Sequence, residues 1–308
     1  MKVIFLGTPQ FAQTILNDIF NSHHQVIGVV CQPDKVSNRG KTIFCPVKQF
    51  ALEKGLPLYQ FEKISRDGVE TLQQLAPDIM VTAAYGQILS EKVISVAPFG
   101  IINVHGSLLP KLRGASPIQS AIMQGLKETG VTILKTVYEV DAGDMLLKKS
   151  LEIGENETSG ELFERMATLG GQAIVEALDQ IENGTATFVA QNHSEATFTK
   201  KILASQERID WNCDAHKLHN LIRALSPNPC AWTTYNGKRV KIYSTAIYNG
   251  EFEDAPCGSV VLCDKSNLVI KAKDGALYIK KLQFEGGKCL DIKAFLCGKR
   301  FMQGEMFE

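Results

Sequence analysis

Residues 2–20 read KVIFLGTPQFAQTILNDIF, and this stretch joins a strand pattern directly to a helix pattern. The short apolar run Lys2–Leu6 is typical of a buried strand, and Gly7-Thr8-Pro9 ends it. Residues 10–20 then carry large apolar side chains at steps of four, the spacing of one helix face. A strand that leads into a helix in this way indicates an α/β protein.

The same alternation continues through the first half of the chain. Val26–Cys31, Ile79–Ala84 and Ile101–Val104 are further apolar runs, and Leu52 and Ile94 lie in helical stretches between them. Strands that alternate with helices predict a Rossmann-like, mostly parallel sheet with helices on both faces. In such sheets ligands bind beyond the carboxyl ends of the strands, where the strand order switches.

The pattern changes toward the end of the second third of the chain. Gly160–Asn183 has the apolar spacing of a long helix, and the polar stretch Gly184–Lys200 is typical of a linker. We therefore predict a first domain in residues 1–185, a linker in residues 186–205 and a C-terminal domain in residues 206–308.

The C-terminal domain begins with a short amphipathic helix pattern, Asp214–Leu225, and continues with β signals. Apolar runs of strand length follow one another at Trp232–Tyr235, Val240–Tyr243, Val260–Cys263, Leu268–Ala272 and Leu277–Leu282. Asn236-Gly237 and Asp274-Gly275 stand between such runs and are strong hairpin signals. This spacing predicts a small β-barrel of the OB-like type.

The composition excludes several classes of protein. The 308 residues are 44% hydrophobic and 21% charged, which is ordinary for a globular protein. We find neither a secretory signal pattern at the start nor an apolar run of the roughly 18 residues that a membrane span needs. The eight cysteines form no C-x-x-C pair, so we interpret them as reduced thiols of a cytoplasmic protein.

Charge is divided unevenly along the chain. Residues 200–308 contain 17 Lys and Arg against 12 Asp and Glu, a net of +5 in a chain whose total is zero. A basic C-terminal part is consistent with a polyanionic partner such as a nucleic acid. An excess of five charges also arises without any such partner, so this signal is weak.

The stretch most informative about chemistry is NVHGSLLPKLRGASPIQ, residues 103–119. Asn103 and His105 end a predicted strand and, two residues apart, point to the same side of the sheet. An amide there can donate to a developing oxyanion, and an imidazole can give or take a proton near neutral pH. The alternative is a turn residue beside a structural histidine, but the loop that follows is rich in glycine and proline and favours a site.

A carboxylate that orients the imidazole is available in a second segment. Asp141-Ala142-Gly143-Asp144 follows the strand-like run Val131–Val137. Either aspartate could serve the histidine, or both could simply build the turn. The residues alone leave these alternatives open.

The chain resembles the methionyl-tRNA formyltransferase family over essentially its whole length. The resemblance is carried by VIFLGTPQFA, QPDKVSNRGK, AYGQIL, NVHGSLLPKLRGASPIQ, VDAGDML, RIDW, LHNLIRALSPNP and NGKRVKIY. It implies a formyltransferase fold and an enzyme that moves the formyl group of 10-formyltetrahydrofolate to the α-amino group of methionine on initiator tRNA. The products would be formylmethionyl-tRNA, used in translation initiation, and tetrahydrofolate.

The resemblance also implies roles for individual residues. Asn103, His105 and Asp141 match the catalytic trio of the family. The folate-binding residues would be Tyr85, Gly86, Gln87, Ile88, Leu89, Ser107, Leu108, Leu109, Pro110, Arg113 and Gly114. Residues 1–185 would then be the catalytic domain.

Contact with initiator methionyl-tRNA would involve two basic regions. The long polar loop Gln32–Phe44 carries Arg39 and Lys41, and the resemblance makes Arg39 the arginine that helps recognise the end of the acceptor stem. Lys238 and Arg239 lie on a predicted hairpin of the C-terminal domain. Solvated charged surfaces are the alternative interpretation of both regions. We expect a monomer.

Other functions remain as alternatives. A formyltransferase with a different acceptor, such as a sugar nucleotide, or a formylfolate hydrolase would share the same crevice, and a non-catalytic RNA-binding protein could use the same scaffold. Cys213, His216 and His219 repeat at steps of three, but no fourth ligand has suitable spacing, so we expect no metal. The first strand is not followed by G-x-G-x-x-G, which argues against a dinucleotide cofactor.

Overall fold

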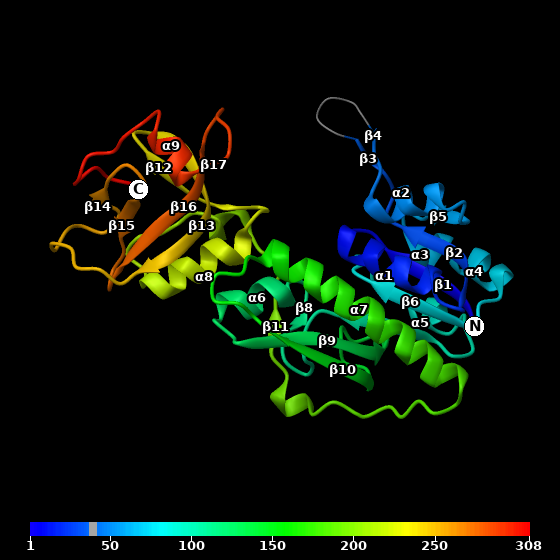
Figure 1. Ribbon diagram of the computed structural model, residues 1–308. Coiled ribbons are helices and arrows are strands. Elements are labelled where there is room, and N and C mark those ends of the chain that lie inside the picture. The colour runs from blue at the N-terminus through cyan, green and yellow to red at the C-terminus, as the bar shows by residue number, and fades with distance from the viewer. Residues whose placement is uncertain (37–41) are drawn as a thin grey trace. The chain divides into compact units, whose positions relative to one another are not determined.

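The computed structural model describes residues 1–36 and 42–308 (Figure 1). It divides into two compact units, which are described separately. The first unit consists of Met1–Pro117, Thr129–Leu151 and Phe163–Thr199. The second unit consists of Ile118–Glu128, Glu152–Leu162 and Lys200–Glu308. The predicted domains had continuous bounds, whereas each of these units takes in more than one stretch of the chain.

The first unit is built on a seven-stranded sheet in the order β10-β9-β7-β6-β1-β2-β5. Its strands are β1 (Lys2–Gly7), β2 (Gln25–Cys31), β5 (Leu58–Gln60), β6 (Ile79–Ala83), β7 (Ile101–His105), β9 (Glu128–Lys135) and β10 (Met145–Glu152). β1 pairs in parallel with β2 and β6, β2 with β5, and β6 with β7. β9 runs antiparallel to β7 and places Thr132 opposite His105. The predicted Rossmann-like, mostly parallel sheet is therefore confirmed.

Helices account for most of the remaining regular structure along this half of the chain. They are α1 (Gln10–Phe20), α2 (Pro46–Glu53), α3 (Ile64–Asp67), α4 (Val69–Leu75), α5 (Glu91–Ile94), α6 (Pro117–Met123) and α7 (Ser159–Glu182). The apolar face of α1 is buried, as its spacing of four predicted. On α7, Gly170 lies close to Ile15 of α1 and Val104 of β7, so a larger residue there would crowd both elements.

Two short two-stranded ribbons, one antiparallel and one parallel, complete the first unit. β3 (Lys35–Val36) pairs with β4 (Thr42–Ile43) in antiparallel fashion. β8 (Arg113–Gly114) pairs in parallel with β11 (Phe198–Thr199). β11 lies within the stretch 186–205 that was predicted as a linker. Part of that polar stretch therefore pairs with the loop after β7. The Thr197 hydroxyl accepts from the Leu112 amide, and the Thr199 hydroxyl accepts from the Ser116 amide.

The second unit contains an antiparallel sheet in the order β12-β13-β16-β15-β14, with β17 paired to β16. Its elements are α8 (Ala215–Leu225), β12 (Ala231–Tyr235), β13 (Lys238–Tyr248), β14 (Val260–Cys263), β15 (Leu268–Lys271), β16 (Ala276–Phe284), β17 (Leu290–Asp291) and α9 (Ile292–Leu296). Asn236 and Gly237 have φ of 50° and 72°, the left-handed pair that a tight two-residue hairpin requires. The Asn-Gly hairpin signal is confirmed.

The last residues bridge the two edge strands of this sheet. Glu308 and Thr234 exchange two backbone hydrogen bonds of 2.8 Å. On the other edge, the Phe307 amide donates to the Gly258 carbonyl, and the Val260 amide donates to the Glu305 carbonyl. The segment therefore satisfies backbone groups that an open sheet would leave exposed, and it closes the β unit as a barrel.

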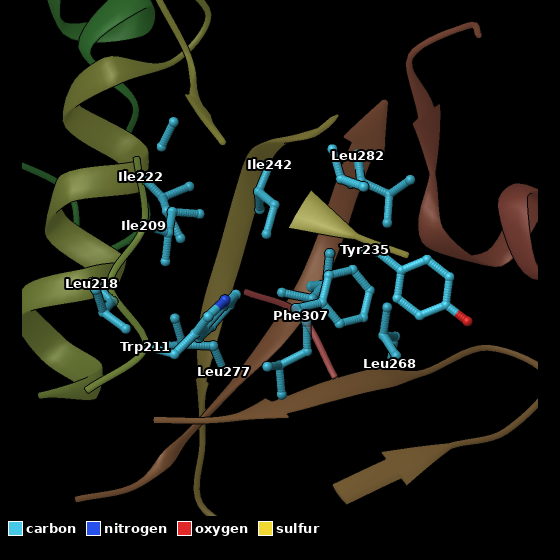
Figure 2. Packing of buried hydrophobic residues seen from close by; sticks show 14 of the residues in the cluster. Ile209, Trp211, Leu218, Ile222, Tyr235, Ile242, Leu268, Leu277, Leu282 and Phe307 are labelled. Atoms are coloured by element: carbon cyan, nitrogen blue, oxygen red, sulfur yellow. The ribbon is translucent and has the colours of Figure 1, made fainter. Parts of the chain in front are cut away.

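The core of the second unit is aromatic at its centre (Figure 2). Phe307 is 1% exposed, and its ring centroid lies 5.0 Å from that of Tyr235. Trp211 is also buried, and its indole N–H donates to the Thr233 hydroxyl at 3.0 Å. This core joins α8 to the strands, and Lys299 Nζ lies 4.6 Å from the ring centroid of Tyr235 at its margin.

Two short 3-10 helices lie in the stretch between α7 and α8. The 3-10 turns span His193–Glu195 and Ala204–Gln206. Across residues 1–36 and 42–308, the helices are too short or too polar for any of them to cross a bilayer.

Candidate active site

The predicted amide and imidazole lie together at the carboxyl end of β7. His105 is 5% exposed, and the Asn103 side chain is partly buried beside it. The Thr82 hydroxyl, from the neighbouring strand β6, donates to Asn103 Oδ1 at 2.8 Å. Because that bond occupies the amide oxygen, it turns the Nδ2 donors of Asn103 away from β6 and toward Asp141.

Asp141 reaches the same point from the connection after β9. Its Oδ1 lies 3.5 Å from His105 Nδ1 and 3.4 Å from Asn103 Nδ2. Its Oδ2 accepts a 2.8 Å hydrogen bond from the Gly114 amide. The carboxylate is therefore shared between the imidazole, the amide and the loop after β7, and the structure brings together the three predicted catalytic side chains.

The turn that carries Asp141 is held in an uncommon conformation. Asp141 has φ of 53°, in the left-handed region. Gln191 supports the turn, because its Nε2 donates to the carbonyls of Asp141 and Gly143, both at 2.8 Å. Asp144, the other candidate carboxylate, is exposed, so Asp141 is the aspartate that faces the imidazole.

Both ring nitrogens of His105 face oxygen acceptors. Nε2 lies 3.0 Å from the Leu112 carbonyl oxygen, and Nδ1 faces the Asp141 carboxylate. A carbonyl and a carboxylate can only accept, so a ring that carries a hydrogen on each nitrogen satisfies both. The site thus fixes the ring plane from two sides.

The loop after β7 is held by hydrogen bonds between side-chain hydroxyls and backbone groups. The Ser107 hydroxyl donates to the Lys111 carbonyl at 2.6 Å, and the Thr132 hydroxyl donates to the Ser107 carbonyl at 2.7 Å. The Leu109 amide donates to Thr132 in turn, and the peptide bond between Leu109 and Pro110 is cis. Leu109 is buried, whereas Leu108 and Pro110 are half-buried.

Arg113 is buried within the first unit and contacts Gln191. Its Nε and Nη2 donate to Gln191 Oε1 at 3.1 and 2.7 Å. No sequence pattern distinguishes Gln191, which lies in the stretch predicted as a linker and contacts the turn of Asp141. Arg113 is therefore linked through Gln191 to the turn that carries Asp141. Gly114, with φ of 108°, meets the backbone of Thr199 too closely for any Cβ.

The predicted folate segment after β6 divides into buried and exposed residues. Tyr85 and Leu89 pack in the apolar cluster of the first unit, and Ile88 is 75% exposed. Gln87 accepts from the Ile64 amide and donates to the Phe61 carbonyl, so it anchors the start of α3. Gly86 has φ of 88°, which lets the chain turn at the strand end.

The Tyr85 hydroxyl is buried and has no hydrogen-bond partner among the residues that the structure describes. Burial raises the pKa of this phenol. Tyr85 lies in the apolar cluster that also contains Leu6 and Val30, where a buried hydroxyl without a partner is uncommon.

Of the predicted tRNA-binding residues, Arg39 and Lys41 lie outside the described residues. Lys238 and Arg239 are exposed at the start of β13. The Arg239 guanidinium lies 4.3 Å from the ring centroid of Trp232, and Nη2 lies 3.5 Å from Glu207 Oε2. This face therefore combines a cationic surface with a partly exposed aromatic ring.

The candidate metal pattern Cys213, His216 and His219 does not converge. His219 contacts Thr245 Oγ1 and the Glu155 carbonyl oxygen, whereas Cys213 contacts Asp210. Within the described part of the chain, one group of ligand-type side chains does gather elsewhere, formed by His23, His24, Asp179 and Glu182. The terminal amine of Met1 lies 2.7 Å from Glu182 Oε1 in this group.

Comparison with known proteins places the chain in a family. A model described as formyl transferase matches residues 1–178, and one described as formyl transferase, C-terminal domain, matches residues 201–300. Methionyl-tRNA formyltransferase of Alkaliphilus metalliredigens is 42% identical over 306 residues, 99% of this chain and 97% of that protein. Its counterpart in Acetivibrio thermocellus is 38% identical over 308 residues, 99% of each chain.

Solved structures share the fold at lower identity. An N-formyltransferase from Helicobacter canadensis, in complex with folinic acid and dTDP-3-aminofucose, has a TM-score of 0.68 at 18% identity, covering 91% of this chain and 98% of that chain. HypX from Aquifex aeolicus, in complex with tetrahydrofolic acid, has a TM-score of 0.65 at 18% identity, covering 97% of this chain and 47% of that chain. The chain belongs to the methionyl-tRNA formyltransferase family.

Proposed function

We propose that Asn103, His105 and Asp141 carry the transfer of a formyl group from 10-formyltetrahydrofolate to the α-amino group of methionine on initiator tRNA. The products are formylmethionyl-tRNA, used in translation initiation, and tetrahydrofolate. The observation that carries this proposal is the shared Asp141 carboxylate, whose Oδ1 lies within 3.5 Å of both the His105 imidazole and the Asn103 amide.

Each side chain has a distinct part in the proposed reaction. Asn103 Nδ2 donates to the oxyanion that forms when the amine adds to the formyl carbon. His105, as the protonated ring, shares in stabilising that charge and supplies a proton to the departing nitrogen. Asp141 fixes the orientation of the ring and stabilises its positive charge.

The contacts of His105 add one requirement to this mechanism. In the structure Nε2 faces the Leu112 carbonyl oxygen at 3.0 Å and Nδ1 faces Asp141. Proton delivery to a substrate atom therefore requires one of these contacts to be exchanged for that atom. The hydrogen bond to the Leu112 carbonyl is the one we expect to be exchanged, because a neutral carbonyl binds an imidazolium less strongly than a carboxylate does.

The folate side of the crevice is proposed to be formed by Tyr85–Leu89, Ser107–Pro110, Arg113 and Gly114. Arg113 acts on this surface indirectly, because its guanidinium is bound to Gln191. No resident metal enters the proposed reaction.

The tRNA is proposed to contact Arg39 and Lys41 in the first unit and Lys238 and Arg239 in the second. Lys238 and Arg239 are exposed in a region of net positive charge. Because phosphate contacts release counterions, the variant Lys238→Ala/Arg239→Ala should lower the slope of log Kd against log salt by about 1–2. Arg39→Ala should raise the KM for tRNA far more than the KM for folate, and equal effects on both would contradict this role.

The decisive experiment is incubation of the purified protein with 10-formyltetrahydrofolate and methionyl-tRNA, followed by detection of formylmethionine. Parallel reactions with an amino-sugar nucleotide or with water as the only acceptor test the alternative acceptors. Formyl transfer to the sugar nucleotide but not to the tRNA would overturn the proposal. We further propose that the enzyme works as a cytoplasmic monomer, which sedimentation at working concentrations can test.

A further inference from the structure

Two neighbouring histidines and two carboxylates meet in the first unit, away from the strand ends that carry Asn103 and His105. His23 and His24 lie in the turn between α1 and β2, and Asp179 and Glu182 lie in the last turn of α7. One ligand atom from each of these four side chains lies within 4.8 Å of the others. The packing of α7 therefore brings residues 155 positions apart in the sequence to one place.

The nitrogen and oxygen atoms of this group are spaced like the ligands of one metal ion. His23 Nε2 lies 2.8 Å from Glu182 Oε2 and 3.6 Å from Asp179 Oδ1. His24 Nε2 lies 3.0 Å from the same Asp179 oxygen. A tetrahedral zinc ion with bonds of about 2.0–2.1 Å holds its ligand atoms roughly 3.3 Å apart. The three separations bracket that value, so small side-chain movements would bring the four atoms to one ion.

The two imidazole rings differ in exposure, although both face the same carboxylates. The His24 side chain is fully buried, whereas the His23 side chain is 62% exposed, so an ion can reach the group from solvent. The two ring centroids lie 4.1 Å apart. Burial, followed by the proximity of His23, lowers the pKa of His24. The buried ring is therefore neutral at neutral pH, which is the form that binds a metal ion.

The terminal amine of Met1 borders the group on another side. It lies 2.7 Å from Glu182 Oε1 and 3.3 Å from His24 Nδ1. The hydrogen bond from this amine, followed by that from His23, lowers the pKa of the Glu182 carboxyl to about 2. Glu182 is therefore an ionised carboxylate, and its second oxygen, Oε2, faces His23.

We propose that His23, His24, Asp179 and Glu182 form a zinc site, to which each side chain contributes one ligand atom. Two imidazoles with two carboxylates suit zinc better than magnesium or calcium, which prefer oxygen ligands. An ion on His24 Nε2 places the ring hydrogen on Nδ1. The charged Met1 amine then gives up its contact with that ring and keeps the one with Glu182 Oε1.

The site lies at the opposite end of the strands from the proposed catalytic residues. Lys2 and Gln25, the first residues of β1 and β2, are register partners, and His24 directly precedes β2. Asn103 and His105 lie at the carboxyl end of β7, and β1, β6 and β7 are parallel. A zinc ion would therefore tie the end of α7 to the turn before β2. It would stabilise the first unit and take no part in formyl transfer, so the proposal is independent of the proposed function.

The test uses the full-length protein, freed of metal with a chelator. Its accessible thiols are first alkylated, because the chain has eight cysteines and thiolates also bind zinc. Calorimetric titration should then show one zinc ion bound per chain, and zinc should raise the midpoint of thermal unfolding. Cobalt in place of zinc should give the visible absorption of a tetrahedral ion without a sulfur-to-metal charge-transfer band. Magnesium and calcium should produce neither effect.

Matched variants identify the ligands. His23→Gln changes an exposed ring, so it should fold, and it should weaken zinc binding at least about tenfold, the loss that follows even from removing a group that supports a ligand. His24→Gln should have the same effect and should also lose the thermal shift. His216→Gln, which removes an exposed ring of the second unit, should bind zinc as the parent protein does. Undiminished zinc binding in His23→Gln, or magnesium binding as strong as zinc binding, would overturn the proposal.

Discussion

The first unit contains two buried histidines, His24 and His105, and the second unit contains His219. His105 and His219 differ in their partners. His105 in the first unit and His219 in the second are both 5% exposed. His105 lies between a carbonyl oxygen and a carboxylate. His219 lies between the Glu155 carbonyl oxygen at 3.0 Å and the Thr245 hydroxyl at 2.9 Å, and a hydroxyl can donate to it.

This difference supports the chemical role proposed for His105 and a structural role for His219. A neutral ring with hydrogen on Nε2 satisfies both partners of His219, and burial lowers the pKa of that ring. The neutral ring of His105 would leave one acceptor without a donor. Burial of a histidine is therefore uninformative about function, whereas the hydrogen-bonding capacity of its partners decides what the ring can do.

The largest effect is expected at His105. His105→Ala should fold but lose roughly 10²–10⁴ in kcat, because it removes the group proposed to supply the proton. Steady-state formylation of methionyl-tRNA measures this, with far-UV circular dichroism as the check on folding. The matched control His219→Gln should keep kcat within about threefold of the parent value. Near-normal turnover of His105→Ala would contradict the proposed role of His105.

The next largest effect is expected in the aromatic core of the second unit, on stability. Phe307→Ala should lower the free energy of unfolding by about 3–5 kcal/mol, because it empties the centre of the aromatic core and loosens the segment that bridges β12 and β14. Urea unfolding followed by tryptophan fluorescence measures it. Met306→Ala, at a neighbouring side chain that is 38% exposed, should cost far less. Equal losses for both variants would contradict the assignment of the core.

A third prediction concerns Gln191, which supports the turn that carries Asp141. Gln191→Leu leaves the Asp141 and Gly143 carbonyls and the Arg113 guanidinium without this partner, so the free energy of unfolding should fall by about 1–3 kcal/mol. Displacement of Asp141 should also lower kcat by on the order of tenfold or more. The exposed neighbour variant Asn192→Ala should change neither quantity by as much. Unchanged kcat in a stable Gln191→Leu protein would show that the turn needs no such support.

The smallest expected effect concerns pH and His219. Its pKa is lowered from the ordinary value of 6.5, chiefly because burial disfavours the charged ring. As pH falls below about 6.5, the unfolded chain takes up the proton first, so stability is lost toward acid pH. The slope from this single group cannot exceed about 1.4 kcal/mol per pH unit. His219→Gln should flatten the pH dependence of the free energy of unfolding below about pH 6.5. His216→Gln, at an exposed ring, should leave that dependence unchanged.

Regular elements with a clear period could be predicted from the sequence. The helix over residues 10–20 and the Asn236-Gly237 hairpin were predicted closely, because apolar spacing and positive φ are local properties. The order of β1, β2 and β6 in the sheet, and the antiparallel pairing of β9, depend on contacts between distant segments. The role of Gln191 could not be predicted, because a polar residue in a polar stretch has no distinguishing local pattern.

The sequence by itself determined the alternation of strands and helices, the β-rich second half and the positions of Asn103 and His105 at one strand end. It left two aspartates as equal candidates for the imidazole. The family resemblance pointed to Asp141, and the tertiary structure adds that its carboxylate faces the imidazole, through the left-handed turn at Asp141 and the Gln191 side chain that holds it. Distances between side chains from separate strands are set by how the sheet packs, and no local pattern in the chain encodes them.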